Sequence, residues 1–559
     1  MNITSDSTRS PLTAIDELDC AYDLVVIGSG AAGLIAAVCA AASGASVLVL
    51  EKAGKLGGTS AVGGGVIWVP NNHLAKAAGY KDSAEAGADY LQAAAGQVMS
   101  SEEIAWFVDT SARAVEFMDE HTRVQLVPLG RPDYHMEWAG AASGGRSLDN
   151  LPFATGDYPG LAEALREPTY FPPLSMIERD ELNGRAPDPG LLQRRSASGI
   201  RTMGGALVGS LAASALDRGV QLALGAEATG LQQMPDGWYL EVDGWRQIRA
   251  SSVVIASGGF EWNPRLRDSF LSFEVTPISA PSNEGSGMEL ALAAGASLKD
   301  MTAIWGVPVI AAPDAVYDGK PSGRMANVEM TLPGSITVNA SGRRFVNEAL
   351  NYHDLCRVFG NIDPVSSTVQ NSPAWLVFDA DYFAKYPVAG STPGVQPAWM
   401  SSAPTLRELA RELGIDAATL QSSVERFNAG ARQGIDAEFG RGSTEQDRHL
   451  GDAANAPNPC LAPLERGPFY AVPIHAGVLG TSGGLSTNEH SQVLDRHGEP
   501  ITGLYAAGNV SAGVFRNNYP GGGATLGSAI TRGYAAGTHI ADTLPRWQKA
   551  EAGHREAGQ

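Results

Sequence analysis

A glycine-rich turn between two short apolar segments constrains the fold of this chain more than any other feature. Residues 23–27 (DLVVI) form a short apolar run, which is typical of a buried parallel strand. Residues 28–33 (GSGAAG) follow directly, and the small apolar residues 31–43 suit a helix packed closely on a sheet. Residues 46–51 (SVLVLE) predict a second strand. Together these segments predict a βαβ unit, and therefore an α/β fold built on a Rossmann-like parallel sheet.

The spacing of this turn indicates a nucleotide site. Gly28 allows the tight turn, Gly30 lets the backbone approach a pyrophosphate, and Gly33 lets helix and strand touch. The start of the helix offers unpaired N–H groups and a positive potential to the phosphates. Glu51 ends the next strand, at about the 20-residue spacing of an acid that binds the ribose hydroxyls. The alternative interpretation is a structural turn without a ligand.

A second glycine turn favours FAD over a nicotinamide cofactor. Residues 54–60 (GKLGGTS) come soon after Glu51, which fits a dinucleotide that extends into the protein toward a flavin. A predicted strand at 251–256 ends in another tight turn, and residues 503–509 (GLYAAGN) predict the closing strand of the same sheet. We expect FAD to contact the following residues: Gly28, Gly30, Ala32, Gly33, Glu51, Lys52, Gly58, Thr59, Ser60, Gly258, Gly508, Asn509, Thr525 and Leu526.

Hydrophobic periodicity predicts several further elements. Residues 102–121, 203–216 and 524–542 have helical patterns, and residues 404–436 are mainly helical. The sequence pattern changes from about residue 300, and residues 335–339 (SITVN) predict a strand in this region. A chain of 559 residues is too long for a single core, so we expect more than one domain.

The composition argues against several classes of partner. Asp and Glu total 60 against 40 Lys and Arg, which gives a net charge of −20 and disfavours nucleic acid and anionic membranes. The four cysteines form no CxxC pair and the histidines are isolated, so the sequence predicts no metal site. Sparse thiols are typical of a reducing compartment, and we expect a cytoplasmic protein.

Neither of the two segments that one would test for membrane targeting has the required pattern. The first 20 residues contain no apolar core of a signal peptide. The longest apolar stretch, residues 34–50, is interrupted by Ser43, Gly44 and Ser46. It is better interpreted as a buried helix that runs into a strand, so we expect no transmembrane segment.

Residues 342–348 (GRRFVNE) are a more specific motif than the glycine turn. Together with that turn, they make the chain resemble the FAD-dependent fumarate reductase and succinate dehydrogenase flavoprotein superfamily over about residues 22–542. The resemblance implies a Rossmann-like FAD-binding domain with an inserted α+β catalytic domain that caps the flavin. We expect an N-terminal extension at 1–21, the first part of the FAD-binding domain at 22–300, the capping domain at 301–468 and the second part of the FAD-binding domain at 469–559.

Within this superfamily, the chain is similar to the 3-ketosteroid Δ1-dehydrogenases. The matching motifs are residues 132–134 (PDY) with 145–147 (GRS), residues 347–352 (NEALNY), residues 479–485 (LGTSGGL) and residues 519–523 (YPGGG). Asn351 and Gly522 replace two prolines that are usual in the family, and the segment 150–200 is expanded. The resemblance implies a role in steroid degradation, which is part of lipid metabolism.

The resemblance also implies a reaction, the 1,2-desaturation of a 3-ketosteroid. Tyr352 is then the general base that takes the C2 proton, and Tyr134 is expected to lower its pKa by hydrogen bonding. The Tyr519 hydroxyl and the Gly523 N–H donate to the C3 oxygen, as in an oxyanion hole. The hydride from C1 passes to the flavin. The alternative for these tyrosines is that they are packing residues with satisfied hydroxyls.

The fumarate-reducing relatives carry basic residues at positions where this chain has none. Their arginine proton donor falls on Tyr352, a substrate-binding histidine falls on Leu479 or Gly480, and a substrate-binding arginine falls on Tyr519. A dicarboxylate buried against these side chains would lack compensating charge, so the sequence argues against succinate and fumarate as substrates.

The resemblance leaves several possibilities open. No histidine lies in the second glycine turn, where some relatives attach FAD covalently, so we expect non-covalent FAD. The expected partners are a hydrophobic ketone and an external electron acceptor such as a quinone. The alternatives are a related desaturase or ene-reductase that acts at another ring position or on a non-steroid enone, and a flavin-binding protein without catalytic activity.

Overall fold

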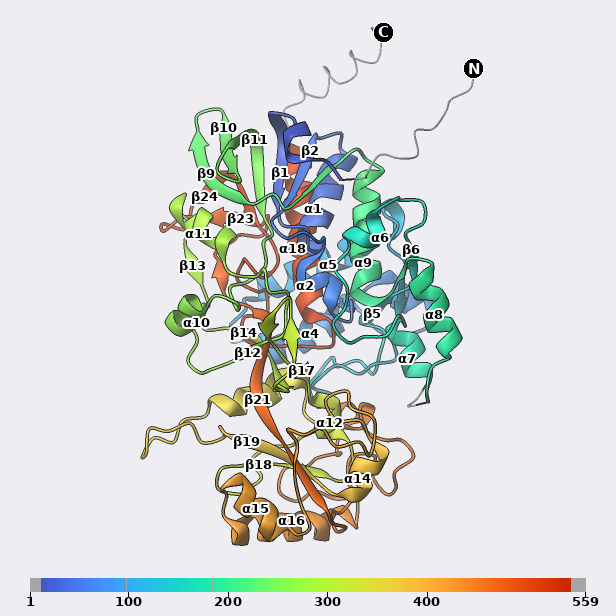
Figure 1. Cartoon of the computed structure of the whole chain (residues 1–559). Coiled ribbons are helices and arrows are strands. Elements are labelled where there is room, and N and C mark those ends of the chain that lie inside the picture. The colour runs from blue at the N-terminus through green and yellow to red at the C-terminus, as the bar shows by residue number, and fades with distance from the viewer. Residues whose placement is uncertain (1–11, 97, 183–184, 544–559) are drawn as a thin grey trace.

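The strand Ala21–Ile27 (β1) lies at the centre of the larger of two lobes (Figure 1). Leu24 and Val26 point into one hydrophobic cluster and Val25 and Ile27 into another, so the strand is buried on both faces. The computed structural model describes residues 12–96, 98–182 and 185–543.

The sheet around β1 has eight strands, in the order β23-β24-β11-β1-β2-β8 with β10 and β9 attached to β11. The neighbours from β24 to β8 pair in parallel, and β23, β10 and β9 add antiparallel pairs. The other strands are Val47–Glu51 (β2), Gln221–Leu224 (β8), Ala228–Met234 (β9), Gly237–Val242 (β10), Arg246–Ile255 (β11), Gln492–Leu494 (β23) and Pro500–Ala506 (β24).

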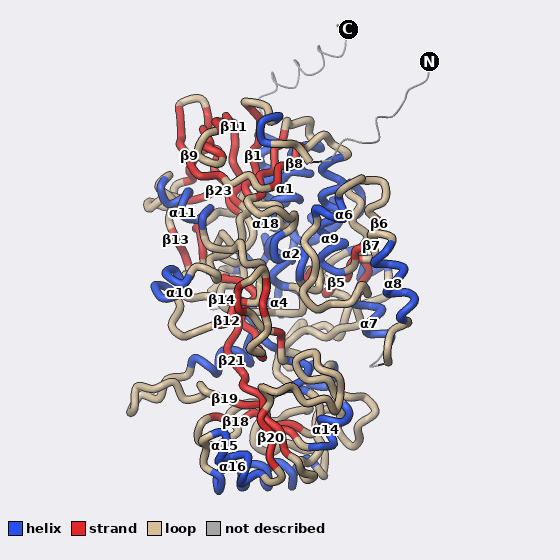
Figure 2. Tube along the Cα trace, viewed as in Figure 1, coloured by secondary structure: helices blue, strands red, loops and turns tan. Residues whose placement is uncertain are grey.

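Helices and a hairpin cover the two faces of this sheet (Figure 2). One face packs against helices whose small apolar residues allow close contact, and the other packs against the β9–β10 hairpin and a short helix. The first face is covered by Ala31–Ala42 (α1), Ser101–His121 (α5), Met203–Leu216 (α9) and Ala524–Thr543 (α18), and the short helix is Ser286–Ala293 (α11). Within the described ranges, none of the helices combines the length and the apolar character needed to cross a membrane.

The smaller lobe is built on a seven-stranded, mostly antiparallel sheet. Its order is β17-β14-β21-β19-β18, with β12 and β20 also paired to β21. The strands are Thr276–Pro277 (β12), Ile304–Ile310 (β14), Arg324–Met325 (β17), Ser335–Asn339 (β18), Ala374–Phe378 (β19), Ser401–Ala403 (β20) and Phe469–Thr481 (β21). The helices include Asn327–Thr331 (α12), Tyr352–Arg357 (α13), Leu406–Leu413 (α15) and Ala417–Ala431 (α16).

These observations confirm the predicted fold class, and the helices and strands predicted by periodicity are present. One boundary differs from the prediction. Residues 469–481, expected in the FAD-binding domain, form β21 and pair with β14 and β19 in the smaller lobe. The pattern of a buried strand does not specify its partners, so the change of lobe falls after Thr481 rather than at residue 468. Residues 1–11 of the expected N-terminal extension lie outside the described residues.

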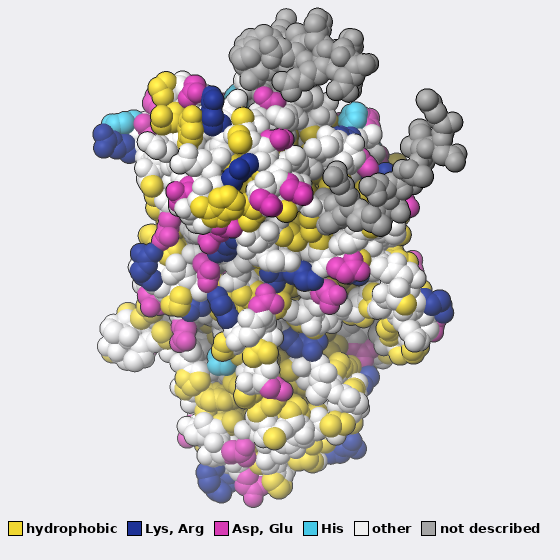
Figure 3. Space-filling model, turned by 45° about the horizontal axis from the view of Figure 1, so that its top comes forward, with side chains coloured by type: hydrophobic (Ala, Val, Ile, Leu, Met, Phe, Trp, Pro, Cys, Tyr) yellow, Lys and Arg dark blue, Asp and Glu magenta, His cyan; other side chains and the backbone are white. Residues whose placement is uncertain are grey.

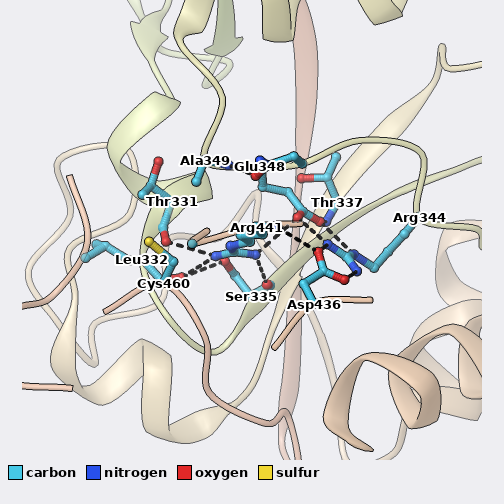
Figure 4. A network of polar contacts seen from close by, with 12 residues as sticks. Thr331, Leu332, Ser335, Thr337, Arg344, Glu348, Ala349, Asp436, Arg441 and Cys460 are labelled. Atoms are coloured by element: carbon cyan, nitrogen blue, oxygen red, sulfur yellow. Dashed lines mark hydrogen bonds and ion pairs between the residues drawn. The ribbon is translucent and has the colours of Figure 1, made fainter. Parts of the chain in front are cut away.

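The motif at 342–348 forms a buried network of ion pairs in the smaller lobe (Figure 4). Arg344 Nη2 lies 2.7 Å from Glu348 Oε2 and 2.9 Å from Asp436 Oδ2, and Arg441 Nη1 lies 3.3 Å from the same Glu348 oxygen. Arg441 also donates to backbone carbonyls next to β18 and α12. Two guanidinium groups thus share the Glu348 carboxylate, Arg344 also pairs with Glu438 at 3.6 Å, and the network ties the chain that leads to Tyr352 to the sheet.

Removal of Glu348 is expected to destabilise the smaller lobe. Glu348→Ala would leave the buried Arg441 without a carboxylate partner, and breaking a buried ion pair in this way costs about 3–5 kcal/mol. Urea unfolding followed by tryptophan fluorescence would measure the loss. The matched control is Glu465→Ala, which removes the exposed ion pair with Arg432 and should change stability by less than about 1 kcal/mol. Equal effects of the two variants would contradict the assignment.

Candidate active site

The predicted nucleotide turn lies where the parallel strands end. Gly28 has a φ of +110°, and a Cβ atom there would approach the Ala256 carbonyl oxygen to 2.4 Å, so only glycine fits. The turn follows β1, Glu51 ends β2, Gly258 follows β11, and Gly508 follows β24. The carboxyl ends of neighbouring parallel strands meet at one edge of the sheet, which is where ligands bind in doubly wound folds.

The second glycine turn closes over the start of α1. The Ala31 N–H donates to Ser60 Oγ at 3.1 Å, and the Gly57 N–H donates to Ser29 Oγ at 2.8 Å. The N-cap residue Gly30 has no side chain to cap α1, so apart from the Ala31 N–H the first turn keeps N–H groups available for an anion. The buried hydroxyl of Ser257, beside Gly258, has no hydrogen-bond partner within the described residues. These features fit a bound dinucleotide.

Most of the other residues predicted to contact FAD lie around the same edge. Glu51 accepts hydrogen bonds at both carboxylate oxygens. The Ser29 N–H and hydroxyl donate to Oε2, and the Ala53 N–H donates to Oε1. Lys52 forms an ion pair with Glu284 at 3.2 Å. Ala32 and Gly33 lie in the first turn of α1, Gly58, Thr59 and Ser60 open a short helix, Asn509 follows β24, and Thr525 and Leu526 open α18. Their individual contacts with FAD stay predictions.

Glu261 is a polar residue of this edge that the sequence analysis missed. Its side chain is fully buried and accepts hydrogen bonds from Ser279 Oγ at 2.6 Å, Asn283 Nδ2 at 2.8 Å and the Thr481 N–H at 3.2 Å. Burial raises the pKa of Glu261. Asn283 also donates to Thr59 Oγ1, so Glu261 connects the second glycine turn to the end of β21. Its position directly after the tight turn at 257–259 was the available sequence signal.

Three predicted catalytic tyrosines, here called the tyrosine triad, meet between the two lobes. The Tyr352 hydroxyl donates to the Tyr519 hydroxyl at 2.8 Å. The ring centroid of Tyr134 lies 5.6 Å from that of Tyr352 and 5.7 Å from that of Tyr519. Tyr352 opens α13 in the smaller lobe, whereas Tyr134 and Tyr519 belong to loops of the larger lobe. The structure therefore brings together residues that are up to 385 positions apart (519 − 134).

Contacts between two of the sequence motifs hold the segment of Tyr134 in place. Asp133 Oδ2 lies 2.7 Å from Arg146 Nη1, and Arg146 also pairs with Asp82 at 2.7 Å, with all three side chains at most 2% exposed. Asp133 accepts a further hydrogen bond from Trp68 Nε1, and the Tyr134 N–H donates to the Pro520 carbonyl. The motif at 132–134 is thus held to the motif at 145–147 and to the loop that carries Tyr519.

The donor geometry at Tyr519 and Gly523 suits a carbonyl oxygen. The Tyr519 hydroxyl accepts hydrogen bonds from Tyr352 and, at 3.1 Å, from Thr525, so its own proton remains free to be donated. Gly523 has a φ of +103°, and a Cβ atom there would lie 2.6 Å from the Val66 carbonyl oxygen. Its N–H has no acceptor among the described residues and lies at the N-terminus of α18.

The prediction that Tyr134 lowers the pKa of Tyr352 is wrong for this structure. Burial raises the pKa of Tyr352 well above its ordinary value, and the neighbouring hydroxyls of Tyr134 and Tyr519 raise it further. The reason is that a phenolate in this enclosed site loses its hydration and faces two other oxygen atoms. Burial raises the pKa of Tyr134 and of Tyr519 as well.

The positions that bind a dicarboxylate in fumarate reductases offer no free cation here. Leu479 packs with Tyr352 in an apolar cluster. The nearest arginines in sequence are engaged elsewhere: Arg516 pairs with Asp300 at 2.7 Å and with Glu103 at 3.3 Å, and Arg532 packs on the ring of Trp106 at 5.3 Å.

Comparison with known proteins agrees with this arrangement. The model of the FAD binding domain family matches residues 23–526. The chain is 40% identical over 537 residues to 4-oxocyclohexanecarboxylate 2-dehydrogenase of Sinomonas cyclohexanicum, covering 93% of both chains. It is 37% identical over 569 residues to 3-oxosteroid 1-dehydrogenase of Mycolicibacterium smegmatis, covering 94% of this chain and 98% of the relative.

A solved structure extends this similarity to the fold. The crystal structure of 3-ketosteroid Δ1-dehydrogenase from Sterolibacterium denitrificans, in complex with 1,4-androstadiene-3,17-dione, matches with a TM-score of 0.87 at 33% identity. The match covers 94% of this chain and 100% of the other. The chain therefore belongs to the FAD binding domain family of flavoproteins, and it is an FAD-dependent oxidoreductase that dehydrogenates a CH–CH group of an oxo compound.

Proposed function

We propose that this enzyme introduces a double bond into the ring of a cyclic ketone, next to the carbonyl group. The observation that carries the proposal is the tyrosine triad with the free Gly523 N–H. These groups combine two hydrogen-bond donors for a ketone oxygen with a hydroxyl that can exchange a proton, which is what desaturation next to a carbonyl requires.

Each residue has a distinct part in the proposed reaction. Tyr519 and Gly523 donate to the ketone oxygen and stabilise the enolate that forms when the α-carbon loses its proton. Tyr352, as phenolate, accepts that proton, and Tyr134 packs against both rings and holds them in position. The closed interface between the lobes excludes water from this step. The chemistry that bound FAD supplies is the two-electron oxidation at the β-carbon.

Two substrate classes fit this reaction. The 1,2-desaturation of a 3-ketosteroid is supported by the steroid dehydrogenases at 37% identity and by the related structure with a bound steroid. A monocyclic ketone is supported by the relative at 40% identity, whose name is 4-oxocyclohexanecarboxylate 2-dehydrogenase. A flavin-binding protein without turnover is the remaining alternative, and substrate-dependent flavin reduction distinguishes it from an enzyme.

Anaerobic mixing with candidate ketones tests the proposal. We expect the purified protein to be yellow, to release FAD on denaturation, and to lose its flavin absorbance with a cyclic ketone but not with succinate. The products should carry a new double bond conjugated with the carbonyl group, as identified by mass spectrometry and NMR. If no 3-ketosteroid and no cyclohexanone derivative bleaches the flavin, the proposal is wrong.

Substitution of the two tyrosines should separate their roles. Tyr352→Phe removes the base and should slow the chemical step by about 10²–10⁴-fold. Tyr519→Phe removes one of two carbonyl donors and should slow it by about 10²–10³-fold. Stopped-flow flavin reduction measures both rates, and the FAD content of each variant shows whether it still folds.

Proton exchange provides the control for these variants. In heavy water, the wild type should exchange the α-hydrogen of a bound ketone without net oxidation. Tyr352→Phe should stop this exchange, whereas Tyr519→Phe should only slow it. Near-normal exchange and turnover in Tyr352→Phe would identify Tyr352 as a packing residue.

The raised pKa of Tyr352 predicts the direction of the pH dependence. A base with a raised pKa is mostly protonated at neutral pH, so kcat/KM should increase about tenfold per pH unit as pH rises toward that pKa. Since the Tyr134 hydroxyl raises the pKa of Tyr352, Tyr134→Phe should move the rising limb to lower pH. A flat profile would contradict the assignment of the base, and a shift to higher pH would restore the role first predicted for Tyr134.

A further inference from the structure

Two arginines from opposite lobes meet at a pair of aromatic rings, Tyr170 and Phe171. Arg324 in β17 lies over the ring of Tyr170 at 4.6 Å, and Arg179 in the helix Met176–Leu182 (α7) lies over the ring of Phe171 at 5.4 Å. The two rings are in contact, with centroids 4.8 Å apart. Figure 1 shows α7 at the lower edge of the larger lobe and β17 at the junction of the lobes.

Neither of these arginines forms an ion pair within the described residues. The nearby Glu329 carboxyl is a weak partner for Arg324, because burial raises the pKa of Glu329 to about 7 although Arg324 lowers it. Arg324 donates to the Ala389 carbonyl at 3.4 Å, and Arg179 contacts the sulfur atom of Met176 at 3.9 Å. In the described part of the chain, no carboxylate oxygen lies within 4.0 Å of either guanidinium group. Figure 3 shows that basic side chains lie among acidic ones on the face drawn there. Acidic residues outnumber basic ones by 60 to 40, so two adjacent arginines without an ion pair are unusual in this chain.

The acids nearest in sequence to Arg179 are already used. Asp180 forms a two-point ion pair with Arg131, with oxygen–nitrogen distances of 2.6 and 2.9 Å. Glu178 forms an ion pair with Arg195 at 2.6 Å. Arg179 is exposed at the surface and accessible to a ligand, and partial desolvation and the neighbouring Arg131 lower its pKa from the ordinary arginine value.

Apolar contacts connect this arginine pair to the catalytic groups on both sides. Met176 packs in one cluster with Val66, whose carbonyl oxygen would touch a Cβ atom at Gly523. Met325, the neighbour of Arg324, packs in another cluster with Tyr352. Arg179 is thus linked through Met176 to the segment beside Gly523, and Arg324 adjoins Met325, which packs against the same cluster as Tyr352.

We infer that Arg179 and Arg324 bind a carboxylate group of the substrate, so that this enzyme acts on a cyclic ketone that carries a carboxylate on its ring. The inference rests on the proposed ring desaturation and names its substrate class. A guanidinium group binds a carboxylate through two parallel N–H···O bonds, and its stacking on an aromatic ring fixes the direction of these donors. A neutral steroid offers this pair no negative charge. Arg179, Tyr170 and Phe171 all lie in the segment 150–200, the part interpreted from the sequence as expanded relative to the steroid dehydrogenases.

The experiment compares an acid with its neutral ester in binding and in turnover. For binding, 4-hydroxybenzoate and its methyl ester are titrated into the oxidised enzyme, because neither has a saturated ring to dehydrogenate, and isothermal titration calorimetry measures both dissociation constants. For turnover, 4-oxocyclohexanecarboxylate and its methyl ester are mixed with the enzyme under anaerobic conditions. The variants are Arg179→Gln, Arg324→Gln, Arg324→Lys and the double glutamine variant. The control is Arg194→Gln, which removes an exposed arginine of the neighbouring helix Pro189–Ala197 (α8).

The wild type and Arg194→Gln should bind the acid more tightly than the ester. The double glutamine variant should lose this preference, with an increase of about 10–100-fold in the dissociation constant of the acid, as expected for hydrogen bonds to a charged group. Arg324→Lys should retain part of the preference because it keeps the charge.

Other outcomes separate the inference from the proposed function. Equal binding of acid and ester by the wild type, or equal weakening of both in the double variant, would give the arginines a structural role and overturn the inference. The proposed function would then still stand if the neutral ketone ester or a 3-ketosteroid reduces the flavin. If no ketone reduces the flavin, the proposed function fails, whereas the binding titration still decides the carboxylate site.

Discussion

The hydrogen bond between the hydroxyls of Tyr352 and Tyr519 is the interaction on which the proposed chemistry depends. It crosses from the smaller lobe to the larger one, so it forms only when both lobes are folded and docked. Each partner is fixed by its own surroundings. The buried ion pairs around Glu348 hold the chain that leads to Tyr352, and the loop of Tyr519 is bonded to the Tyr134 segment. A base and an acid for one ketone thereby come from different lobes.

Burial of the triad has two opposite effects on the proposed reaction. The enclosed triad keeps water away and strengthens each hydrogen bond to a developing enolate. The same loss of hydration raises the pKa of Tyr352, because a phenolate is poorly stabilised there. The positive end of α18 and the donor at Gly523 favour negative charge on the substrate instead. The site is therefore better suited to stabilise the enolate than to hold a phenolate at rest.

The contrast with dicarboxylate enzymes and steroid enzymes follows from where positive charge is placed. At the positions that bind fumarate in other flavoproteins, this chain has apolar or aromatic residues, and Arg516 is neutralised by Asp300 and Glu103. The arginines without an ion pair lie instead at the Tyr170–Phe171 rings, and apolar clusters link this place to the residues around Gly523 and Tyr352. A substrate with a ketone at one end and a carboxylate at the other would have a binding partner for each: the Tyr519 and Gly523 donors for the ketone, and the arginines for the carboxylate.

The sequence by itself determined the features that depend on short segments: the glycine turn at 28–33, the strands and helices around it, the glycine required at 523, and the identity of the tyrosines. Backbone conformation and hydrophobic periodicity are local, so they can be predicted from neighbouring residues. Only the tertiary structure decided that β21 pairs in the smaller lobe, that Glu261 is buried beside Thr481, that the pKa of Tyr352 is raised rather than lowered, and that Arg179 meets Arg324 without an ion pair in the described part of the chain. Strand partners, burial and charge balance depend on residues that are distant in the chain, and local patterns do not contain that information.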